Sequence, residues 1–242
     1  MLEKLKRGLI VSCYASASDG DGGNKEMANP VVMSHIAHAV ELGGAKGIRT
    51  NIDNIREIKK KCKLPVIGIK KITKAEGGFE TGDFRITPTL KEVKALVGEG
   101  ADLIAIDGTN RARYDDLTLE EFIKRIKRDY NIPIIADIST YEEGIKAHNA
   151  GADAVGTTLS GYTPYSENPI VFGVLPLPDP DFGLIQRLSS RGIKVIAEGR
   201  IGTPKQAKKA LDSGAFAVVV GTAITMPRRV AESFVMEMTG SN

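Results

Sequence analysis

The chain contains no tryptophan, and aromatic residues make up only 5% of its 242 residues. Its formal net charge is only +3, and the lysines and arginines are spread along the sequence. A nucleic-acid-binding protein usually carries a basic stripe together with aromatic residues for base stacking. The composition therefore argues against a nucleic-acid partner, and we expect the partner to be a small molecule.

Cysteine and histidine are equally scarce. Cys13 and Cys62 match neither a disulfide framework nor a zinc signature, so we expect free thiols in a reducing, cytoplasmic compartment. The three histidines, His35, His38 and His148, fall on expected helix surfaces, and no cluster of His, Asp and Glu has the spacing of a metal site. The sequence therefore predicts no metal site.

Long apolar runs are missing as well. No stretch approaches the ~20 apolar residues that a membrane-spanning helix needs, so no membrane partner is expected. Lys4, Lys6 and Arg7 precede an apolar run at residues 8–13, a pattern that is similar to a short lipoprotein signal. We interpret this run as a first buried strand, because the same pattern recurs downstream.

The chain does contain a regular alternation of short apolar runs and amphipathic segments. The apolar runs, some of them continuous, suit parallel strands that are covered on both faces. Alternation of this kind fits a barrel or an open doubly wound sheet, and the count of eight favours one (β/α)8 TIM barrel domain spanning residues 1–242. Strands are expected at residues 8–14, 45–50, 64–70, 102–107, 133–139, 154–160, 194–198 and 216–221, and helices at 31–42, 52–62, 89–99, 118–129, 141–149, 181–190, 204–212 and 227–238.

The expected connections differ in length at the two ends of the strands. Three strand-to-helix loops are long, at residues 15–30, 71–88 and 161–180, and in a barrel these loops gather on the face that holds the active site. Helix-to-strand connections are tight. The glycines expected to end helices in the left-handed conformation are Gly43, Gly100, Gly151, Gly192 and Gly214.

Glycine-rich turns at residues 198–203 and 220–224 follow the seventh and eighth expected strands. Glycine lets backbone N–H groups approach an anion closely, and a following helix adds a favourable dipole. Barrels often bind phosphate at this place. We therefore predict a phosphate site that includes Gly199, Arg200, Gly221 and Thr222.

Charged residues stand at the ends of five expected strands, where buried positions rarely tolerate charge unless it is paired or used. A lysine in such a place can exchange protons or form a Schiff base with a carbonyl substrate. Alternation does not fix whether Lys70 or Lys71 faces the barrel. The charged residues at these strand ends are Arg49, Lys70 or Lys71, Asp107, Asp137 and Glu198.

Several of these segments are familiar as a set. The segments at residues 9–13, 44–49, 65–71, 86–89, 136–140, 157–163, 197–201 and 220–225 resemble the N-acetylmannosamine-6-phosphate 2-epimerase family in sequence and in order. The resemblance implies a cytoplasmic enzyme of amino-sugar (sialic acid) catabolism that interconverts N-acetylmannosamine 6-phosphate and N-acetylglucosamine 6-phosphate without a metal or redox cofactor. It assigns catalysis to Lys71 and Glu198, and substrate binding to Ser12, Arg49 and Asp137.

The chain departs from the family pattern in four places: Tyr14 replaces the usual glutamine, Lys70 an apolar residue and Met226 the usual arginine, and the first and third long loops are extended. Arg228 carries a charge nearby, but two positions along a helix point elsewhere. Another phosphosugar-binding barrel enzyme, either an isomerase or a lysine aldolase, and a sugar-phosphate sensor without turnover stay open as alternatives. The third long loop and the apolar last helix suggest a homodimer.

Overall fold

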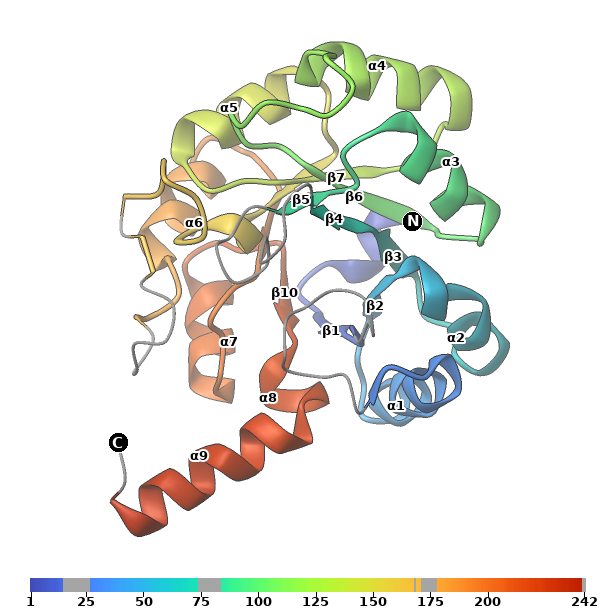
Figure 1. Ribbon diagram of the computed structural model, residues 1–242. Helices are drawn as coiled ribbons and strands as arrows, with labels where there is room; N and C mark the ends of the chain where they lie inside the picture. Colours follow the sequence, from blue (N-terminus) through green and yellow to red (C-terminus); the bar gives the residue numbers. More distant parts are fainter. Residues whose placement is uncertain (15–26, 74–83, 168, 171–177, 241–242) are drawn as a thin grey trace.

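The computed structural model describes residues 1–14, 27–73, 84–167, 169–170 and 178–240. Eight parallel strands close into one barrel with helices around it (Figure 1), which confirms the predicted (β/α)8 fold. Each expected strand is present and shorter than expected, although the second strand ends one residue later than predicted. In barrel order the strands are β1 (Leu9–Ser12), β10 (Ala217–Val220), β9 (Val195–Ala197), β8 (Ala154–Gly156), β7 (Ile134–Asp137), β6 (Leu103–Asp107), β3 (Val66–Ile69) and β2 (Gly47–Asn51).

The eight expected helices are also present. Four of them begin with a reciprocal capping box, in which a threonine side chain accepts from the backbone and a Glu or Gln three residues later accepts in return. Thr203 followed by Pro204 is one of these starts, as predicted. The helices are α1 (Pro30–Leu42), α2 (Ile55–Lys61), α3 (Leu90–Gly98), α4 (Leu119–Tyr130), α5 (Tyr141–Asn149), α6 (Phe182–Ser189), α7 (Pro204–Asp212) and α9 (Pro227–Thr239).

Most of the predicted glycine caps are confirmed. Gly100, Gly151, Gly192 and Gly214 have φ values between 77° and 100°. The prediction for Gly43 was wrong, because Gly43 is right-handed at φ −73° and the next residue, Gly44, takes φ 90°. Two adjacent glycines can both make this turn, and sequence alone does not say which one does.

Two apolar layers hold the fold together. One lies between the strands and the helices, and the other fills the barrel, where residues two apart along each strand point inward. A short 3-10 helix, η1 (Leu2–Leu5), adds Leu2 and Leu5 to the inner layer. The backbone N–H of Arg7 donates to the carbonyl of Phe216, which ties this segment to the amino end of β10. The interior is therefore a packed core, and room for a ligand is left at the carboxyl ends of the strands.

A two-stranded ribbon stands apart from the barrel and was not predicted. β4 (Lys71–Thr73) pairs antiparallel with β5 (Phe84–Ile86), so two parts of the second expected long loop form a hairpin beside β3 (Figure 1). Residues 15–26, 74–83, 168 and 171–177 of the three long loops lie outside the described residues.

The last helix differs from all the others. A single turn, α8 (Thr222–Thr225), leads into α9, which extends away from the barrel and has no buried residue (Figure 1). Its apolar side chains Phe234, Val235 and Met238 are exposed, up to 82% for Met238. Over the described part of the chain, no helix has the length and apolar character needed to cross a membrane.

Candidate active site

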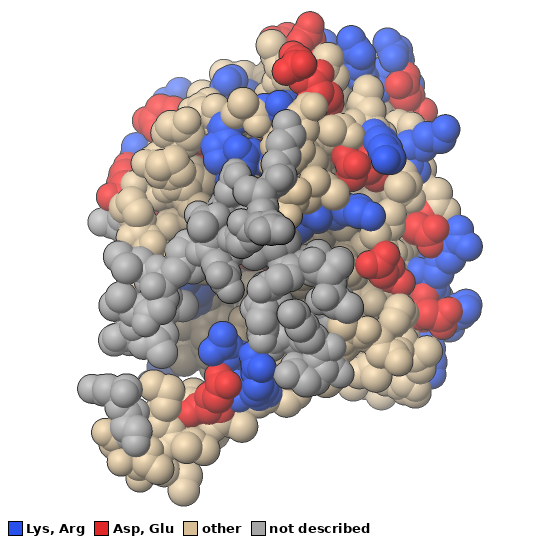
Figure 2. All heavy atoms as spheres, viewed as in Figure 1, with Lys and Arg blue, Asp and Glu red and all other residues tan. Residues whose placement is uncertain are grey.

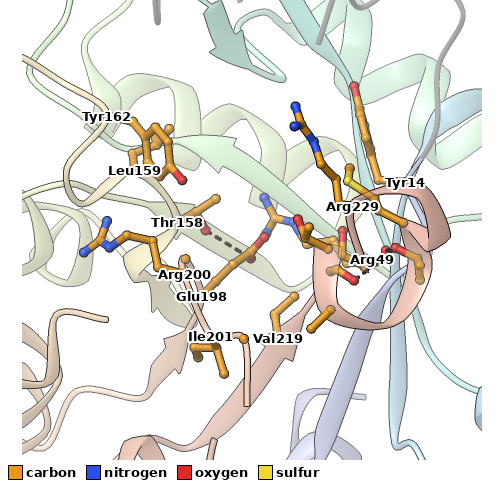
Figure 3. A pocket seen from close by; sticks show the side chains of 18 of the residues that line it. Tyr14, Arg49, Thr158, Leu159, Tyr162, Glu198, Arg200, Ile201, Val219 and Arg229 are labelled. Carbon is orange, nitrogen blue, oxygen red and sulfur yellow. Dashed lines mark hydrogen bonds and ion pairs between the residues drawn. The ribbon is translucent and has the colours of Figure 1, made fainter. Parts of the chain in front are cut away.

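A cavity of about 770 Å³ opens at the carboxyl ends of the strands. Eight of the nine residues predicted for the site line it: Ser12, Arg49, Lys71, Glu198, Gly199, Arg200, Gly221 and Thr222. Figure 3 shows Tyr162 and Arg200 across the cavity from Tyr14, with Arg49 and Glu198 between them. The predicted catalytic and phosphate-binding positions thus share one space.

A compact group of charged side chains forms the floor of this cavity. Arg49 of β2 donates two hydrogen bonds to Asp137 of β7, at 3.2 and 2.6 Å, and lies 3.2 Å from a carboxylate oxygen of Glu198. Thr158 donates to Asp137 at 2.6 Å and can also donate to Glu198, at 3.1 Å (Figure 3). Three strands and the turn after β8 therefore supply one connected network.

Burial sets the protonation behaviour of this network. Burial raises the pKa of Glu198, and Asp137 adds to the rise, while Arg49 and Lys71 act against it. For Arg49, burial alone would lower the pKa, but the two carboxylates reverse this effect and raise it. Arg49 is thus a permanent cation, and Glu198 holds a proton more readily than an exposed glutamate.

Asp137 is the one predicted site residue that does not line the cavity. It is fully buried behind Arg49, and its carboxylate accepts from both Arg49 and Thr158. Space for this carboxylate depends on Gly156 of β8, because a Cβ there would lie 2.6 Å from the Asp137 oxygen Oδ1. Its geometry suits it to orient Arg49 and Thr158 rather than to touch a ligand.

Lys71, and not Lys70, belongs to the cavity. It continues the inward-facing series of Ile67 and Ile69 on β3, although it lies on the hairpin strand β4. Its ammonium nitrogen lies 4.2 Å from the ring centre of Tyr14 and 5.2 Å from that of Phe84. The alternation of side chains along β3 thus continues into β4, and it places Lys71 rather than Lys70 in the cavity.

The hairpin that carries Lys71 is anchored to the end of β6. The backbone N–H of Ile86 lies 3.4 Å from the carboxylate of Asp107, which also accepts from Arg111 at 2.6 Å. Arg113 donates to the carbonyls of Asp107 and Pro88, at 3.0 and 2.6 Å. Asp107, a predicted rim charge, thus supports the hairpin and is absent from the cavity wall.

The two glycine turns lie beside the charged floor. Gly199 has φ 106°, which favours glycine, and Gly221 packs so closely on Ser12 that a Cβ would lie 3.3 Å from the Ser12 Cβ. Arg200 lines the cavity, but its guanidinium donates to the carbonyls of Ser160 and Asp179. The backbone of the turns, more than the Arg200 charge, is therefore available to an anion.

Thiol and metal chemistry find little support in the described residues. Burial raises the pKa of the Cys13 thiol to about 12 and that of Cys62 to about 11, so neither is a ready nucleophile. No group of three His, Cys, Asp or Glu side chains that could hold a metal ion occurs in the part of the chain that the structure describes.

Comparison with known proteins gives this arrangement a family. The family model described as "Putative N-acetylmannosamine-6-phosphate epimerase" matches residues 33–240. A relative from Caldanaerobacter subterraneus subsp. tengcongensis, named "Putative N-acetylmannosamine-6-phosphate 2-epimerase", is 46% identical over 238 residues, covering 97% of this chain and 92% of the relative. The chain belongs to the N-acetylmannosamine-6-phosphate 2-epimerase family.

Further epimerase relatives agree along the whole chain. One from Clostridioides difficile with the same name is 45% identical and covers 97% of both chains. The solved structure entitled "Structural and biochemical characterization of the N-acetylmannosamine-6-phosphate 2-epimerase from Clostridium perfringens" superposes with a TM-score of 0.83 at 39% identity, covering 97% of this chain and 95% of that one. The resemblance inferred from the sequence segments is thereby confirmed.

The structure also places the departures from the usual epimerase pattern. Met226 lines the cavity, Arg228 does not, and Arg229 of α9 extends into it (Figure 3). Figure 2 shows basic and acidic side chains gathered near the start of α9, where Arg228 and Arg229 both pair with Glu232. Met226 is the non-helical residue between α8 and α9, so helical spacing from Met226 could not have identified Arg229.

Other cavity residues were missed because no local pattern marks them. Thr158 follows β8 in a 3-10 turn, η4 (Thr157–Leu159), and Phe84 enters only through the hairpin. Tyr162 lies in the turn beyond η4. Their positions depend on how distant segments meet.

Proposed function

We propose that the chain interconverts N-acetylmannosamine 6-phosphate and N-acetylglucosamine 6-phosphate by removing and returning the proton on C2 of the open-chain sugar. The proposal rests on family membership and on one observation above all. Lys71, Glu198 and both glycine turns line a single cavity, so a base, an acid and an anion site face the same ligand.

The chemistry requires a base at C2. In the open-chain sugar C2 is next to the C1 aldehyde, which makes its proton acidic enough to remove. The neutral Lys71 amine takes this proton and becomes an ammonium, while the electron pair of the broken C–H bond forms an enediolate with its charge on O1. Rotation about the C2–C3 bond turns the opposite face of C2 toward the Lys71 ammonium, which returns a proton there, inverts C2 and becomes a neutral amine again. Removal and return of a proton by a positioned amine is general acid–base catalysis.

The charged floor supplies the second half of the reaction. Because the pKa of Glu198 is raised, this residue can deliver a proton to O5 or O1 during ring opening and take it back afterwards. Arg49, held by Asp137 through two hydrogen bonds, is placed to stabilise the negative charge that develops on O1. In this proposal Asp137 acts through Arg49 and Thr158.

The phosphate is assigned to the turns after β9 and β10. Backbone N–H groups around Gly199, Gly221 and Thr222 can bind its oxygens, with Ser12 beside them. Arg229 adds a cation from α9, which compensates for the methionine at position 226. No metal or organic cofactor enters any of these steps, and the cytoplasm is the expected location.

Incubation of the protein with N-acetylmannosamine 6-phosphate in deuterated water tests the proposal. Proton NMR should show loss of the C2 signal together with appearance of N-acetylglucosamine 6-phosphate. Binding without exchange at C2 would support a sensor instead. A lysine adduct trapped by borohydride, without exchange, would support an aldolase.

A homodimer through α9 is a further part of the proposal. Phe234, Val235 and Met238 form an exposed apolar face on a helix that leaves the barrel (Figure 1). Light scattering after size-exclusion chromatography should give twice the chain mass. Met238→Glu should shift the protein toward the monomer, whereas Glu237→Gln should not.

A further inference from the structure

The side chain of Lys71 is surrounded by aromatic rings. Its ammonium lies 4.2 Å from the ring centre of Tyr14 and 5.2 Å from that of Phe84, both within the ~6 Å range of a cation–π contact. Tyr14 follows β1 and is 6% exposed, and Phe84 lies on β5. Both rings line the same cavity as Lys71.

The position of Lys71 depends on contacts outside the barrel sheet. It lies on a hairpin strand and not on a barrel strand, so the sheet of the barrel does not fix its position directly.

We propose that Tyr14 is a positioning residue whose ring, together with that of Phe84, holds the ammonium of Lys71 at the cavity wall and favours the protonated lysine. The catalytic consequence rests on the proposed function, in which Lys71 becomes an ammonium when it takes the C2 proton. A ring face binds the ammonium more strongly than the neutral amine. It therefore stabilises the state that contains the enediolate and the ammonium relative to the state that contains the intact sugar and the neutral amine.

Other groups also influence the proton on Lys71. The charged or titratable side chains that line the cavity in the described residues are Glu198, which favours the ammonium, Arg49, Arg200 and Arg229, which oppose it, and Tyr162. Lys70 is next to Lys71 in the chain. All of these groups stay in place when Tyr14 alone is changed, so a comparison of variants isolates the ring. Tyr14→Phe separates the ring from its hydroxyl.

Competitive acetylation with a trace of acetic anhydride tests the ring contact without any substrate. Mass spectrometry of the Lys71 peptide from about pH 7 to about pH 11 gives the pKa of this lysine in wild type, Tyr14→Phe, Tyr14→Leu and Tyr14→Gln. We expect Tyr14→Phe to match wild type. Tyr14→Leu and Tyr14→Gln should lower the Lys71 pKa by about half a unit to one unit.

A matched control removes a similar contact elsewhere. Lys209 lies 4.3 Å from the ring centre of Phe182, outside the cavity. Phe182→Leu should leave the labelling of Lys71 unchanged. Tyr14→Gln, a polar replacement without a ring, is the second variant should Tyr14→Leu not fold, and melting curves will check both.

The C2-exchange rate then tests the catalytic consequence. At a pH above the Lys71 pKa, Tyr14→Gln should exchange several-fold more slowly than wild type and Tyr14→Phe, through kcat more than through KM. An unchanged Lys71 titration in folded Tyr14→Gln and Tyr14→Leu would overturn the inference and leave the proposed function intact. Absence of C2 exchange in wild type would overturn the proposed function, while the labelling experiment would still decide on the ring contact.

Discussion

The two sides of the cavity that carry the proposed catalytic residues are built in different ways. Arg49, Asp137 and Glu198 lie on or next to barrel strands, bind one another directly, and are 2%, 0% and 15% exposed. Lys71 lies on a separate ribbon, is half-buried, and touches aromatic rings. The barrel holds the first group in place through several strands at once, while the position of Lys71 depends on the hairpin and its anchors.

This difference predicts which substitutions affect stability as well as activity and which affect activity alone. The charged floor is part of the packed interior, so a change there should affect both folding and turnover. The lysine side is an addition to the barrel, so a change there should affect turnover with little cost in stability. Four substitutions test this difference between the charged floor and the lysine side, from the largest expected effect to the smallest.

Replacement of the lysine should separate the two properties most clearly. Lys71→Met should slow C2 exchange on the order of 10³-fold, because no other described group takes the same place beside the rings. The free energy of unfolding should change by less than about 1 kcal/mol, since the side chain is half-buried. NMR exchange and urea titration measure the two effects. Persistent exchange would remove Lys71 from the mechanism.

Replacement of the buried aspartate should damage both properties. Asp137→Asn leaves Arg49 without its bidentate partner inside the protein and should lower the free energy of unfolding by about 3 kcal/mol. Exchange should also fall, since Arg49 and Thr158 lose their orientation. Asp212→Asn is the matched control, because its exposed pair with Lys208 is worth less than about 1 kcal/mol. Equal stability losses in both variants would contradict the comparison.

Glu198→Gln should slow C2 exchange by about 10²-fold or more. Its effect on stability should depend on pH. Because the folded-state pKa of Glu198 is raised, wild type carries no cost from this group below pH 4.5 and a growing cost as pH rises through the folded value. Glutamine removes this cost.

Urea titrations from about pH 4 to about pH 8 should therefore show the variant gaining stability relative to wild type as pH rises. A constant difference between the two proteins would contradict the raised pKa.

Loosening the hairpin should have the smallest effect. Arg113→Lys cannot reproduce both hydrogen bonds to the carbonyls of Asp107 and Pro88, and should cost about 1 kcal/mol of stability. Exchange should fall several-fold in kcat with KM nearly unchanged, because the turns after β9 and β10 are untouched. Arg128→Lys, on the exposed face of α4, should change neither quantity. A large rise in KM would show that the hairpin binds the sugar as well.

The sequence was sufficient for the barrel because its signals are local. These signals act within a few residues: β-branched runs mark the strands, threonines cap four of the helices, and left-handed glycines follow several helices. The charged floor could also be predicted, since strand-end charges such as Arg49 and Glu198 must meet at one rim in a parallel barrel. Lys71 was found by resemblance, because alternation in the sequence left Lys70 and Lys71 open and the structure shows that Lys71 lines the cavity.

What could not be predicted depends on contacts between distant segments. The hairpin joins residues 71–73 to residues 84–86, so nothing in either segment alone marks the pairing. The role of Asp137 behind Arg49 follows from burial, which a strand-end position does not reveal. Arg229 enters the cavity because a short turn, α8, re-aims the chain before α9 begins.

The missing side chain at Gly156 limits how this site can change over time. A single methyl group there would compete with the oxygen of Asp137 for the same volume, although alanine is otherwise among the mildest of replacements in a strand. Position 156 is therefore expected to tolerate no residue but glycine for as long as position 137 holds a carboxylate, and the two should be lost or kept together.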